Sequence, residues 1–338
     1  MNLQRGLEEL WYGRASAAGR AVGAVLLAPP SWLFGAVAAA RRTAYSRGWF
    51  AARRVPRPVV VVGNLTVGGS GKTPLTVWLV EWLQARGLRA GVVSRGYGGE
   101  ADAPRRVTVD TPAHEAGDEP LLIARRTGAP VYVGRDRVAC AELLAPEVDV
   151  VVADDGLQHY RLARDLEIVV VDGRRRFGNG RLLPAGPLRE PPARLRSAGI
   201  VVANGGTPAP GELAMTLVPG DVVALADGTR GSLTAFAAAS PGVHAVAGIG
   251  DPPRFFATLR GAGLAIEEHA FPDHATFTAG DLQFGDARPV LMTEKDAVKC
   301  GGFADPRLHY LEVSARFAPE DEARLGAAVL RALRRGGD

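Results

Sequence analysis

Apolar residues follow two patterns along this chain, short valine-rich runs and longer stretches with helical spacing. The runs predict strands, and they lie at residues 59–62, 90–94, 130–133, 148–153, 166–171, 243–249 and 289–293. The helical spacing predicts helices at residues 77–83, 121–126, 254–260 and 319–335. Runs that are almost entirely apolar are typical of strands buried on both faces of a parallel sheet. The alternation of strands and helices therefore predicts an α/β fold.

A change in composition near residues 204–211, where glycine and proline become frequent, indicates a hinge between domains. A chain of 338 residues is long enough for two domains. We expect an apolar and basic N-terminal segment over residues 1–54, a first α/β domain over 55–204, and a smaller α/β domain over 205–338 that ends in a helix.

The N-terminal segment contains an uncharged stretch at residues 21–40, which is long enough to span a bilayer. The pair Pro29-Pro30 divides this stretch into halves, each too short to cross alone. Aromatic and basic residues follow at Trp32, Phe34, Arg41, Arg42, Arg47, Arg53 and Arg54. The pattern predicts a broken helix pair that lies in or on the membrane, held by apolar burial and by attraction of arginine to anionic lipid. A secretory signal and a helix buried in a protein core are the alternatives.

A glycine-rich turn joins the strand at 59–62 to the helix at 77–83, and Lys72 and Thr73 follow it directly. This order is typical of a phosphate-binding loop, in which backbone N–H groups and a helix N-terminus surround an anion. The strict pattern has glycine where this chain has Thr66, so a turn without a ligand is the alternative. The expected nucleotide-binding residues are Thr66, Val67, Gly68, Gly69, Ser70, Gly71, Lys72 and Thr73.

Charge, cysteine content and lysine content indicate which kinds of function and site are expected. The net charge of +4 is mild, and no basic stripe interleaved with aromatic residues is present, so nucleic-acid binding is not expected. The two cysteines, Cys140 and Cys300, are far apart in the sequence and indicate neither a disulfide framework nor a zinc site. The forty basic residues include only three lysines, Lys72, Lys295 and Lys299, which favours a specific role for Lys72.

Acidic residues follow two of the predicted elements. Asp154 and Asp155 come directly after the strand at 148–153. Adjacent carboxylates repel each other unless a cation lies nearby, and strand-end carboxylates downstream of a phosphate loop commonly hold Mg²⁺. Asp118 precedes the helix at 121–126, where an acidic residue is usually a helix cap.

Three loops carry side chains that suit a polar substrate. Asp273 and His274 are adjacent on a loop and could handle a proton, although a lone histidine is usually structural. Residues 95–99 place Tyr97 between glycines at the end of a strand, where open α/β sheets contact ligands. Residues 174–190 hold arginine and asparagine among glycine and proline, which suits an anionic, sugar-like ligand.

Seven motifs occur in the order Gly63-Asn-Leu-Thr-Val-Gly-Gly-Ser-Gly-Lys-Thr-Pro74, Ser94-Arg-Gly-Tyr-Gly98, Gly117-Asp-Glu-Pro120, Asp154-Asp-Gly-Leu-Gln-His159, Phe177-Gly-Asn-Gly-Arg-Leu-Leu-Pro-Ala-Gly-Pro-Leu-Arg-Glu190, Phe271-Pro-Asp-His274 and Met292-Thr-Glu-Lys-Asp-Ala-Val-Lys-Cys300. Together they resemble the tetraacyldisaccharide 4′-kinase family, the lipid A 4′-kinases of Gram-negative bacteria. The resemblance covers about residues 55–300 and includes the apolar N-terminus. The family pattern also has threonine at the position of Thr66.

The resemblance implies a P-loop NTPase-like α/β/α sandwich with a second, smaller α/β domain, and a membrane-associated helical segment at the N-terminus. It implies transfer of the γ-phosphate of ATP to the 4′-hydroxyl of a tetraacylated glucosamine disaccharide 1-phosphate, giving lipid IVA, with Mg²⁺ as cofactor. The enzyme would be peripheral or monotopic at the cytoplasmic face of the bacterial inner membrane. Its partners would be the lipid A disaccharide 1-phosphate and membrane lipids, with no nucleic acid and no obligate protein partner.

The resemblance also implies roles for individual residues. Lys72 would serve the phosphates, and Asp118 would be the catalytic base, oriented by His274 after domain closure brings the two together. The implied metal ligands are Thr73, Asp154 and Asp155. The implied contacts to the sugar-phosphate headgroup are Tyr97, Arg135, Arg189 and Glu190.

A membrane-associated regulatory P-loop NTPase is the alternative function. Such a switch needs guanine-reading residues or switch loops. The stretch Thr293-Glu-Lys-Asp296 has the wrong order for a guanine-reading motif. The sequence therefore favours the kinase.

Overall fold

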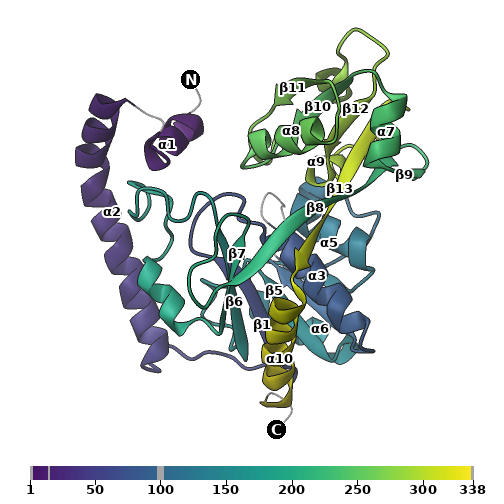
Figure 1. Ribbon diagram of the computed structural model, residues 1–338. Helices are drawn as coiled ribbons and strands as arrows, with labels where there is room; N and C mark the ends of the chain where they lie inside the picture. Colours follow the sequence, from purple (N-terminus) through teal and green to yellow (C-terminus); the bar gives the residue numbers. More distant parts are fainter. Residues whose placement is uncertain (1–2, 14–15, 97–102, 336–338) are drawn as a thin grey trace. The chain divides into compact units, whose positions relative to one another are not determined.

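The computed structural model describes residues 3–13, 16–96 and 103–335 (Figure 1). Contacts between residues divide the chain into two compact units. Unit 1 contains Met1–Lys72, Arg137–Thr216 and Phe317–Asp338, and unit 2 contains Thr73–Asp136 and Leu217–Arg316. Each unit is assembled from separate segments of the chain. The consecutive domains expected at 1–54, 55–204 and 205–338 stay a prediction.

Unit 1 is built on parallel strands in the order β7-β6-β1-β5. Their bounds are β1 Val59–Asn64, β5 Val150–Asp154, β6 Leu166–Asp172 and β7 Ile200–Asn204. β1 is buried at every position, which agrees with its unbroken valine run. Each strand ends in asparagine or aspartate, and parallel pairing brings these ends to one edge of the sheet. The predicted α/β fold is confirmed, although β7 was not expected.

The remaining elements of unit 1 are short except at the two ends of the chain. They are α1 Leu3–Trp11, α2 Ala17–Ser46, α6 Arg137–Leu144, the 3₁₀ turns Ala145–Glu147 and Pro192–Ser197, and α10 Pro319–Arg335. Helix α10 packs on β1 and β6, and its bounds are those predicted from its apolar spacing. The segment between β6 and β7 lacks regular strands or α-helices, as its glycine and proline content predicted.

Unit 2 contains two groups of strands. In the first, β2 Ala90–Ser94 pairs in parallel with β4 Val131–Val133, and β3 Arg105–Val107 pairs antiparallel with β4. In the second, four parallel strands lie in the order β11-β10-β12-β13. Their bounds are β10 Val243–Ala247, β11 Ile266–Ala270, β12 Val290–Thr293 and β13 Leu308–Phe317. Two further strands, β8 Leu213–Ala224 and β9 Arg230–Ser232, pair antiparallel.

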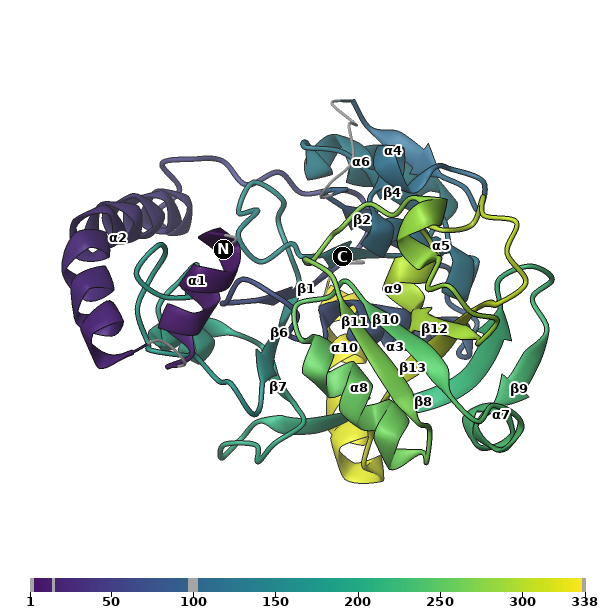
Figure 2. The same ribbon diagram turned by 90° about the horizontal axis from the view of Figure 1, so that it is seen from above.

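The helices of unit 2 flank these strands. Their bounds are α3 Lys72–Gln84, α4 Ala113–Ala116, α5 Asp118–Thr127, α7 Leu233–Ala239, α8 Pro252–Gly261, α9 Glu294–Ala297 and the 3₁₀ turn Ala279–Leu282. Helix α8 packs against β10 and β11 (Figure 2). Its buried side chains Phe255, Phe256 and Leu259 join the apolar core of those strands. Helix α5 packs against α9, which brings the start of α5 close to the residues that follow β12.

The prediction that Pro29-Pro30 breaks the N-terminal helix is wrong. Helix α2 continues through both prolines, and its bend of 44° separates Ala17–Gly23 from Val25–Ser46. A proline ring clashes with the carbonyl four residues earlier, so Pro29 distorts the turn at Val25 rather than its own position. The bend therefore lies about one turn before the residues that cause it.

Helix α2 exposes most of its apolar side chains within the described part of the chain. The exposed ones are Val22, Val25, Leu26, Trp32, Leu33 and Val37. This exposure excludes the alternative of a helix buried in a protein core. Among the residues described, no single helix is long and apolar enough to cross a bilayer, whereas the two arms of α2 together reach the necessary length and composition.

The N-terminal helices hold the loop before β7. The indole Nε1 of Trp11 donates to the Pro184 carbonyl at 2.9 Å, and the Ser31 hydroxyl donates to the Leu182 carbonyl at 2.8 Å. These contacts attach α1 and α2 to the glycine- and proline-rich segment of residues 177–190. That segment reaches the glycine-rich turn described next.

Candidate active site

The glycine-rich turn after β1 is held from both sides within unit 1. The Val67 N–H donates to the Pro187 carbonyl at 2.9 Å, and the Arg189 N–H donates to the Leu65 carbonyl at 2.6 Å. Thr66 forms a β-bridge with Leu188. Because the Val67 N–H is already used, it is not available to the predicted nest of phosphate-binding amides.

The tip of the turn is exposed and has the backbone conformation that glycine permits. Gly68 and Gly71 have φ values of +91° and +94°. Asn204, at the end of β7, donates to the Ser70 carbonyl at 3.0 Å, and the Asn64 amide donates to the Ser70 hydroxyl at 3.0 Å. No hydrogen bond from the N–H of Gly68, Gly69 or Gly71 to another residue occurs in the described parts of the chain. Strand-end amides thus fix the turn, while its glycine N–H groups have no acceptor among the described residues.

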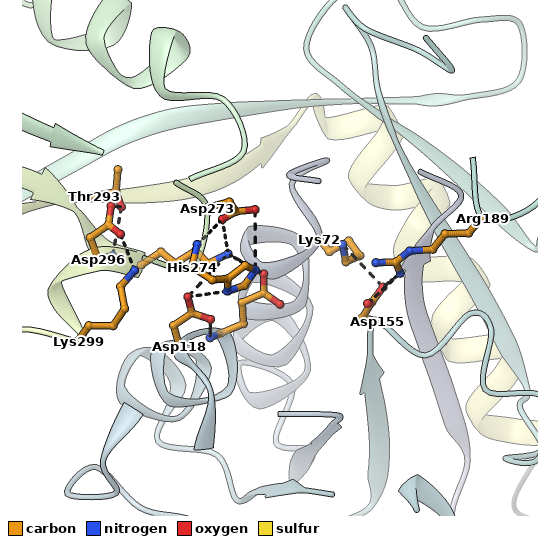
Figure 3. Close-up of polar contacts among 11 residues, drawn as sticks. Lys72, Asp118, Asp155, Arg189, Asp273, His274, Thr293, Asp296 and Lys299 are labelled. Carbon is orange, nitrogen blue, oxygen red and sulfur yellow. Dashed lines mark hydrogen bonds and ion pairs between the residues drawn. The ribbon is translucent and has the colours of Figure 1, made fainter. Parts of the chain in front are cut away.

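Lys72, the first residue of α3, faces the carboxylate of Asp155 (Figure 3). The Lys72 Nζ lies 3.7 Å from Asp155 Oδ1, and the Arg189 guanidinium donates to both Asp155 oxygens at 3.0 Å. Burial alone would raise the pKa of Asp155, but the charges of Lys72 and Arg189 outweigh it and hold this pKa well below its ordinary value. Asp155 is therefore a charged carboxylate between two cations.

Asp154 differs from its neighbour in its surroundings. It is the last residue of β5 and is fully buried, whereas Asp155 follows with a left-handed φ of 45°. The Arg137 guanidinium donates to the Asp155 carbonyl at 3.0 Å, which stabilises this turn. The two acids expected to share a metal thus point into different environments at the same strand end.

Glu190 is enclosed by other side chains of unit 1. Gln158 donates to Glu190 Oε1 at 3.0 Å, and the Tyr160 hydroxyl donates to Oε2. The Arg194 Nε lies 3.5 Å from Glu190 Oε2. Glu190 is only 4% exposed, so its carboxylate is fixed by this network. Burial and the Glu190 charge raise the pKa of Tyr160, which keeps the phenol protonated as the donor.

A second cluster of charged residues lies in unit 2. Asp118 is the first residue of α5 and His274 lies in the loop after β11. The His274 Nδ1 lies 3.0 Å from Asp118 Oδ2 (Figure 3). Lys295, in α9, lies 3.3 Å from His274 Nε2 and 3.1 Å from Glu119 Oε1. These contacts are consistent with Nδ1–H donating to Asp118 while Nε2 accepts from Lys295.

Burial and charge shift the pKa values of this cluster in opposite directions. Burial alone would raise the pKa of Asp118, but the hydrogen bond from His274 and the charge of Lys295 lower it below its ordinary value. Burial alone would lower the pKa of His274, but the hydrogen bond to Asp118 raises it above its ordinary value. The pair therefore holds an ionised carboxylate at neutral pH.

A pocket of about 510 Å³ opens beside Asp118 within unit 2. Its lining includes Asp118 and His274 together with three basic side chains, His114, Arg125 and Lys299. This volume is typical of a small-molecule site. The lining thus combines two carboxylates, Asp110 and Asp118, with three basic side chains, which suits a polar ligand that presents a proton to Asp118.

The structure corrects the expected way in which Asp118 and His274 meet, and it does not describe Tyr97. Asp118 and His274 belong to the same compact unit and are already in contact, so the expectation that domain closure joins them is wrong. Tyr97 lies outside the described residues. Arg135 is exposed in the loop before α6.

Sequence reasoning missed the neighbours that hold these residues in place. Lys295 and Glu119 complete the Asp118 cluster, and Gln158 fixes Glu190. The rarity of lysine was a usable signal for Lys295, because the family-like motif at 292–300 contains two of the three lysines. Nothing in the local sequence indicates that Gln158 reaches residue 190.

Comparisons with known proteins identify relatives of this chain. The family model described as LpxK, tetraacyldisaccharide-1-P 4′-kinase, matches residues 23–334. A tetraacyldisaccharide 4′-kinase of Alkalilimnicola ehrlichii is 53% identical over 317 residues, covering 90% of this chain and 95% of its own length. One of Aeromonas salmonicida is 52% identical over 318 residues, covering 91% and 92%.

A solved structure has the same architecture. LpxK from Aquifex aeolicus, crystallised in complex with ATP, superposes with a TM-score of 0.77 at 28% sequence identity, covering 92% of this chain and 99% of that one. The family match spans most of the chain, and the two curated relatives exceed half identity over almost their full lengths. The chain therefore belongs to the tetraacyldisaccharide-1-phosphate 4′-kinase family, the ATP-dependent kinases of lipid A biosynthesis.

Proposed function

We propose that this chain transfers the γ-phosphate of ATP to the 4′-hydroxyl of tetraacyldisaccharide 1-phosphate, with Asp118 as the base and the turn at residues 66–73 as the phosphate site. The observation that carries the proposal is the hydrogen bond of 3.0 Å between Asp118 and His274 beside a pocket with both basic and acidic side chains. A sugar hydroxyl is a weak nucleophile, and a positioned carboxylate that accepts its proton assists the attack.

Asp118 is suited to the role of base by its contacts. Its Oδ1 accepts from the Glu119 N–H at 2.9 Å and its Oδ2 accepts from His274. Each carboxylate oxygen has a second lone pair, so both retain capacity for a substrate hydroxyl. The two contacts orient the carboxylate. When His274 is protonated, its positive charge also compensates the negative charge of Asp118.

Lys72 is the group that would stabilise charge on the transferred phosphoryl. It is a cation at the start of α3, directly after the exposed glycine N–H groups. Positioning and electrostatic stabilisation supply most of the rate enhancement in phosphoryl transfer. ATP binding would replace part of the contact between Lys72 and Asp155 with contacts to phosphate.

The residues present also fit Mg²⁺. Asp154 and Asp155 supply carboxylate oxygens at the end of β5, and Thr73 supplies a hydroxyl, which are the ligand types that this ion prefers. When bound, Mg²⁺ neutralises charge on the phosphate oxygens. Asp155 is paired with the cations Lys72 and Arg189. A site for Mg²⁺ and triphosphate likewise needs carboxylates for the metal and cations for the phosphates.

We propose Tyr97, Arg135, Arg189 and Glu190 as contacts to the sugar-phosphate headgroup. Arg189 is half of an ion pair and could exchange its partner for a phosphate. Glu190 accepts from Gln158 and Tyr160, so a headgroup that contacts it would displace one of these donors.

We further propose that α2 places the enzyme at the cytoplasmic face of the inner membrane, as a peripheral or monotopic protein. The exposed apolar side chains of α2 and the arginines that follow support this proposal. An enzyme held there could phosphorylate the disaccharide while the acyl chains stay in the bilayer.

The test is incubation of detergent-solubilised protein with labelled ATP and tetraacyldisaccharide 1-phosphate, with Lys72→Ala as the control. We expect label in the lipid with the natural sequence and none with the variant. Label-free lipid in the presence of demonstrated ATP binding would refute the proposal. ATP turnover that ignores added lipid would favour the regulatory NTPase instead.

A further inference from the structure

Three side chains that commonly bind metals meet on the two neighbouring strands β10 and β11 of unit 2. In the parallel register His244 lies opposite Glu267, and Val246 lies opposite His269. Side chains alternate between the faces of a strand, so Glu267 and His269 share one face of β11 with His244 of β10. This cluster takes no part in the proposed phosphoryl transfer.

The distances within the cluster are close to those of ligands that share one ion. The Nδ1 of His244 lies 3.0 Å from the Nε2 of His269. Glu267 Oε2 lies 3.7 Å from His244 Nδ1, and Oε1 lies 3.9 Å from His269 Nε2. Ligand atoms about 2.0–2.1 Å from a tetrahedral ion lie roughly 3.3–3.4 Å apart. The two contacts of Glu267 use different oxygens, so rotation of its exposed carboxylate would bring one oxygen toward both imidazoles and an ion between them.

The carboxylate of Asp286 contacts the ring nitrogen of His244 that does not face the cluster. The His244 side chain is 1% exposed, and its Nε2 lies 3.0 Å from Asp286 Oδ1. A hydrogen bond from Nε2–H to this carboxylate would leave the Nδ1 lone pair directed at the cluster. Metal-binding histidines usually donate their second N–H to a carboxylate in this way.

Aromatic stacking fixes the planes of both imidazoles. The ring of Phe284 stacks on His269 with centroids 3.9 Å apart and on His244 with centroids 4.3 Å apart. Fixed ring planes reduce the side-chain entropy that metal binding would otherwise cost. The apolar ring also covers one side of the cluster, while Glu267, with its side chain 53% exposed, leaves the other side open.

The competing interpretation is a hydrogen-bonded histidine pair with a structural role alone. A hydrogen bond between two ring nitrogens needs a proton between them, and an ion could replace that proton. Arg288 donates to Glu267 at 2.6 Å and to Asp286 at 2.7 Å, so it competes for the carboxylate ligand but not for either imidazole. The two-histidine core of the cluster is therefore available whether or not Arg288 is paired.

We infer that His244, Glu267 and His269 bind one divalent transition-metal ion of the zinc class. Two imidazoles and one carboxylate suit Zn²⁺, whereas Mg²⁺ prefers oxygen ligands alone. Water would occupy the fourth position. The ion joins the edge strand β11 to β10, and β11 leads directly into the loop that carries Asp273 and His274. Its role is to hold that edge strand in place.

The test uses the full, tag-free chain after treatment with a chelator, titrated with ZnCl₂ by calorimetry in the absence of ATP. We expect one equivalent of Zn²⁺ to bind and to raise the thermal unfolding temperature. His244→Gln and His269→Gln should each abolish this binding, and Asp286→Asn should weaken it about 10- to 100-fold. His309→Gln, which changes a histidine elsewhere on β13, should bind as the natural sequence does.

Two further measurements test for the metal site even if the buried His244 variant does not fold. Glu267 is exposed, so Glu267→Gln should fold and bind Zn²⁺ more weakly. Co²⁺ bound in place of Zn²⁺ should give the intense visible absorption of a tetrahedral site, and Glu267→Gln should change that spectrum. Absence of stoichiometric binding, or equal binding by His269→Gln and the natural sequence, would overturn the inference.

Discussion

Asp118 and His274 share a contact of 3.0 Å although 156 residues separate them in the chain. His274 holds a left-handed φ of 60°, a conformation that costs a non-glycine residue about 1–2 kcal/mol. The His274 N–H donates to Asp273 Oδ1 at 3.1 Å, which stabilises that turn. The fold thus maintains an unfavourable backbone conformation that directs the imidazole at the carboxylate, as expected for a residue selected for its position.

Replacing the carboxylate of Asp118 should separate catalysis from nucleotide binding. We expect Asp118→Asn to lower turnover about 10²- to 10⁴-fold, the range that general-base catalysis contributes. The predicted phosphate-binding residues 66–73 do not include Asp118, so ATP affinity should stay unchanged. Single-turnover kinetics and ATP titration measure the two effects. The partly exposed Asp221→Asn serves as the matched control, and full turnover by Asp118→Asn would remove Asp118 from the mechanism.

The stability contributed by the same pair should depend on pH with a defined sign. Asp118 has a lowered pKa in the folded state, so its contribution is present above its unfolded value of 3.8 and is lost as pH falls through the folded pKa. His274 has a raised pKa, so its contribution is complete below 6.5 and is lost as pH rises through the folded pKa. The coupling between them should therefore be largest from pH 3.8 to 6.5.

A double-mutant cycle of Asp118→Asn and His274→Gln measures that coupling. Urea unfolding of the four proteins at about pH 5.5 and about pH 9 gives the coupling free energy at each pH. We expect the larger value at the lower pH. Equal coupling at both values would mean that the histidine does not carry charge in the folded pair.

The parts of the fold that depend on local pattern could be predicted from the sequence. The valine run of β1 and the apolar spacing of α10 specify buried elements without reference to distant residues. β8 could not be predicted, because its exposed and buried positions follow from pairing with two different strands. The bend of α2 near residue 24 was expected at Pro29-Pro30 instead, because the expectation did not consider that a proline distorts the turn before it.

The same distinction between local pattern and distant contacts applies to the residues of the candidate site. Lys72 and Asp155 follow strands in a recognisable order, so their candidate roles could be predicted. Lys295 could not be assigned a role, because its partners Glu119 and His274 come from segments far apart in the sequence. The cluster of His244, Glu267 and His269 could not be predicted for a similar reason, since these residues meet only through the pairing of β10 with β11.

The two left-handed glycines of the phosphate turn should respond differently to alanine. A Cβ on Gly71 would lie 2.3 Å from the Asn204 amide nitrogen, whereas a Cβ on Gly68 would meet nothing within 4 Å. Both variants incur about 1–2 kcal/mol of backbone strain, but only Gly71→Ala must also displace Asn204 from the Ser70 carbonyl.

We therefore expect Gly71→Ala to lower the free energy of unfolding more than Gly68→Ala, by at least one lost hydrogen bond of about 1 kcal/mol. Urea unfolding measures the difference, and Gly68→Ala is the matched control because the two φ values differ by only 3°. Equal destabilisation would show that the turn relaxes around the added methyl group.

Removing apolar surface from α2 should weaken membrane association without affecting nucleotide binding. Leu26 and Leu33 lie seven residues apart on one face of the helix and are 69% and 68% exposed. Burying one leucine side chain contributes about 1.5–3 kcal/mol, so the double variant Leu26→Ser/Leu33→Ser should partition into vesicles at least 10²-fold less. The expected consequence for catalysis is a higher KM for the lipid substrate.

Sedimentation with vesicles that contain anionic lipid measures the partitioning, and ATP titration checks that the phosphate site is intact. Leu143→Ser is the matched control, because Leu143 is 52% exposed on α6 and lies outside the N-terminal helices. If attachment depended on the arginines alone, the double variant would sediment like the control and high salt would release both proteins. Apolar insertion is distinguished from charge attraction because only the former persists at high salt.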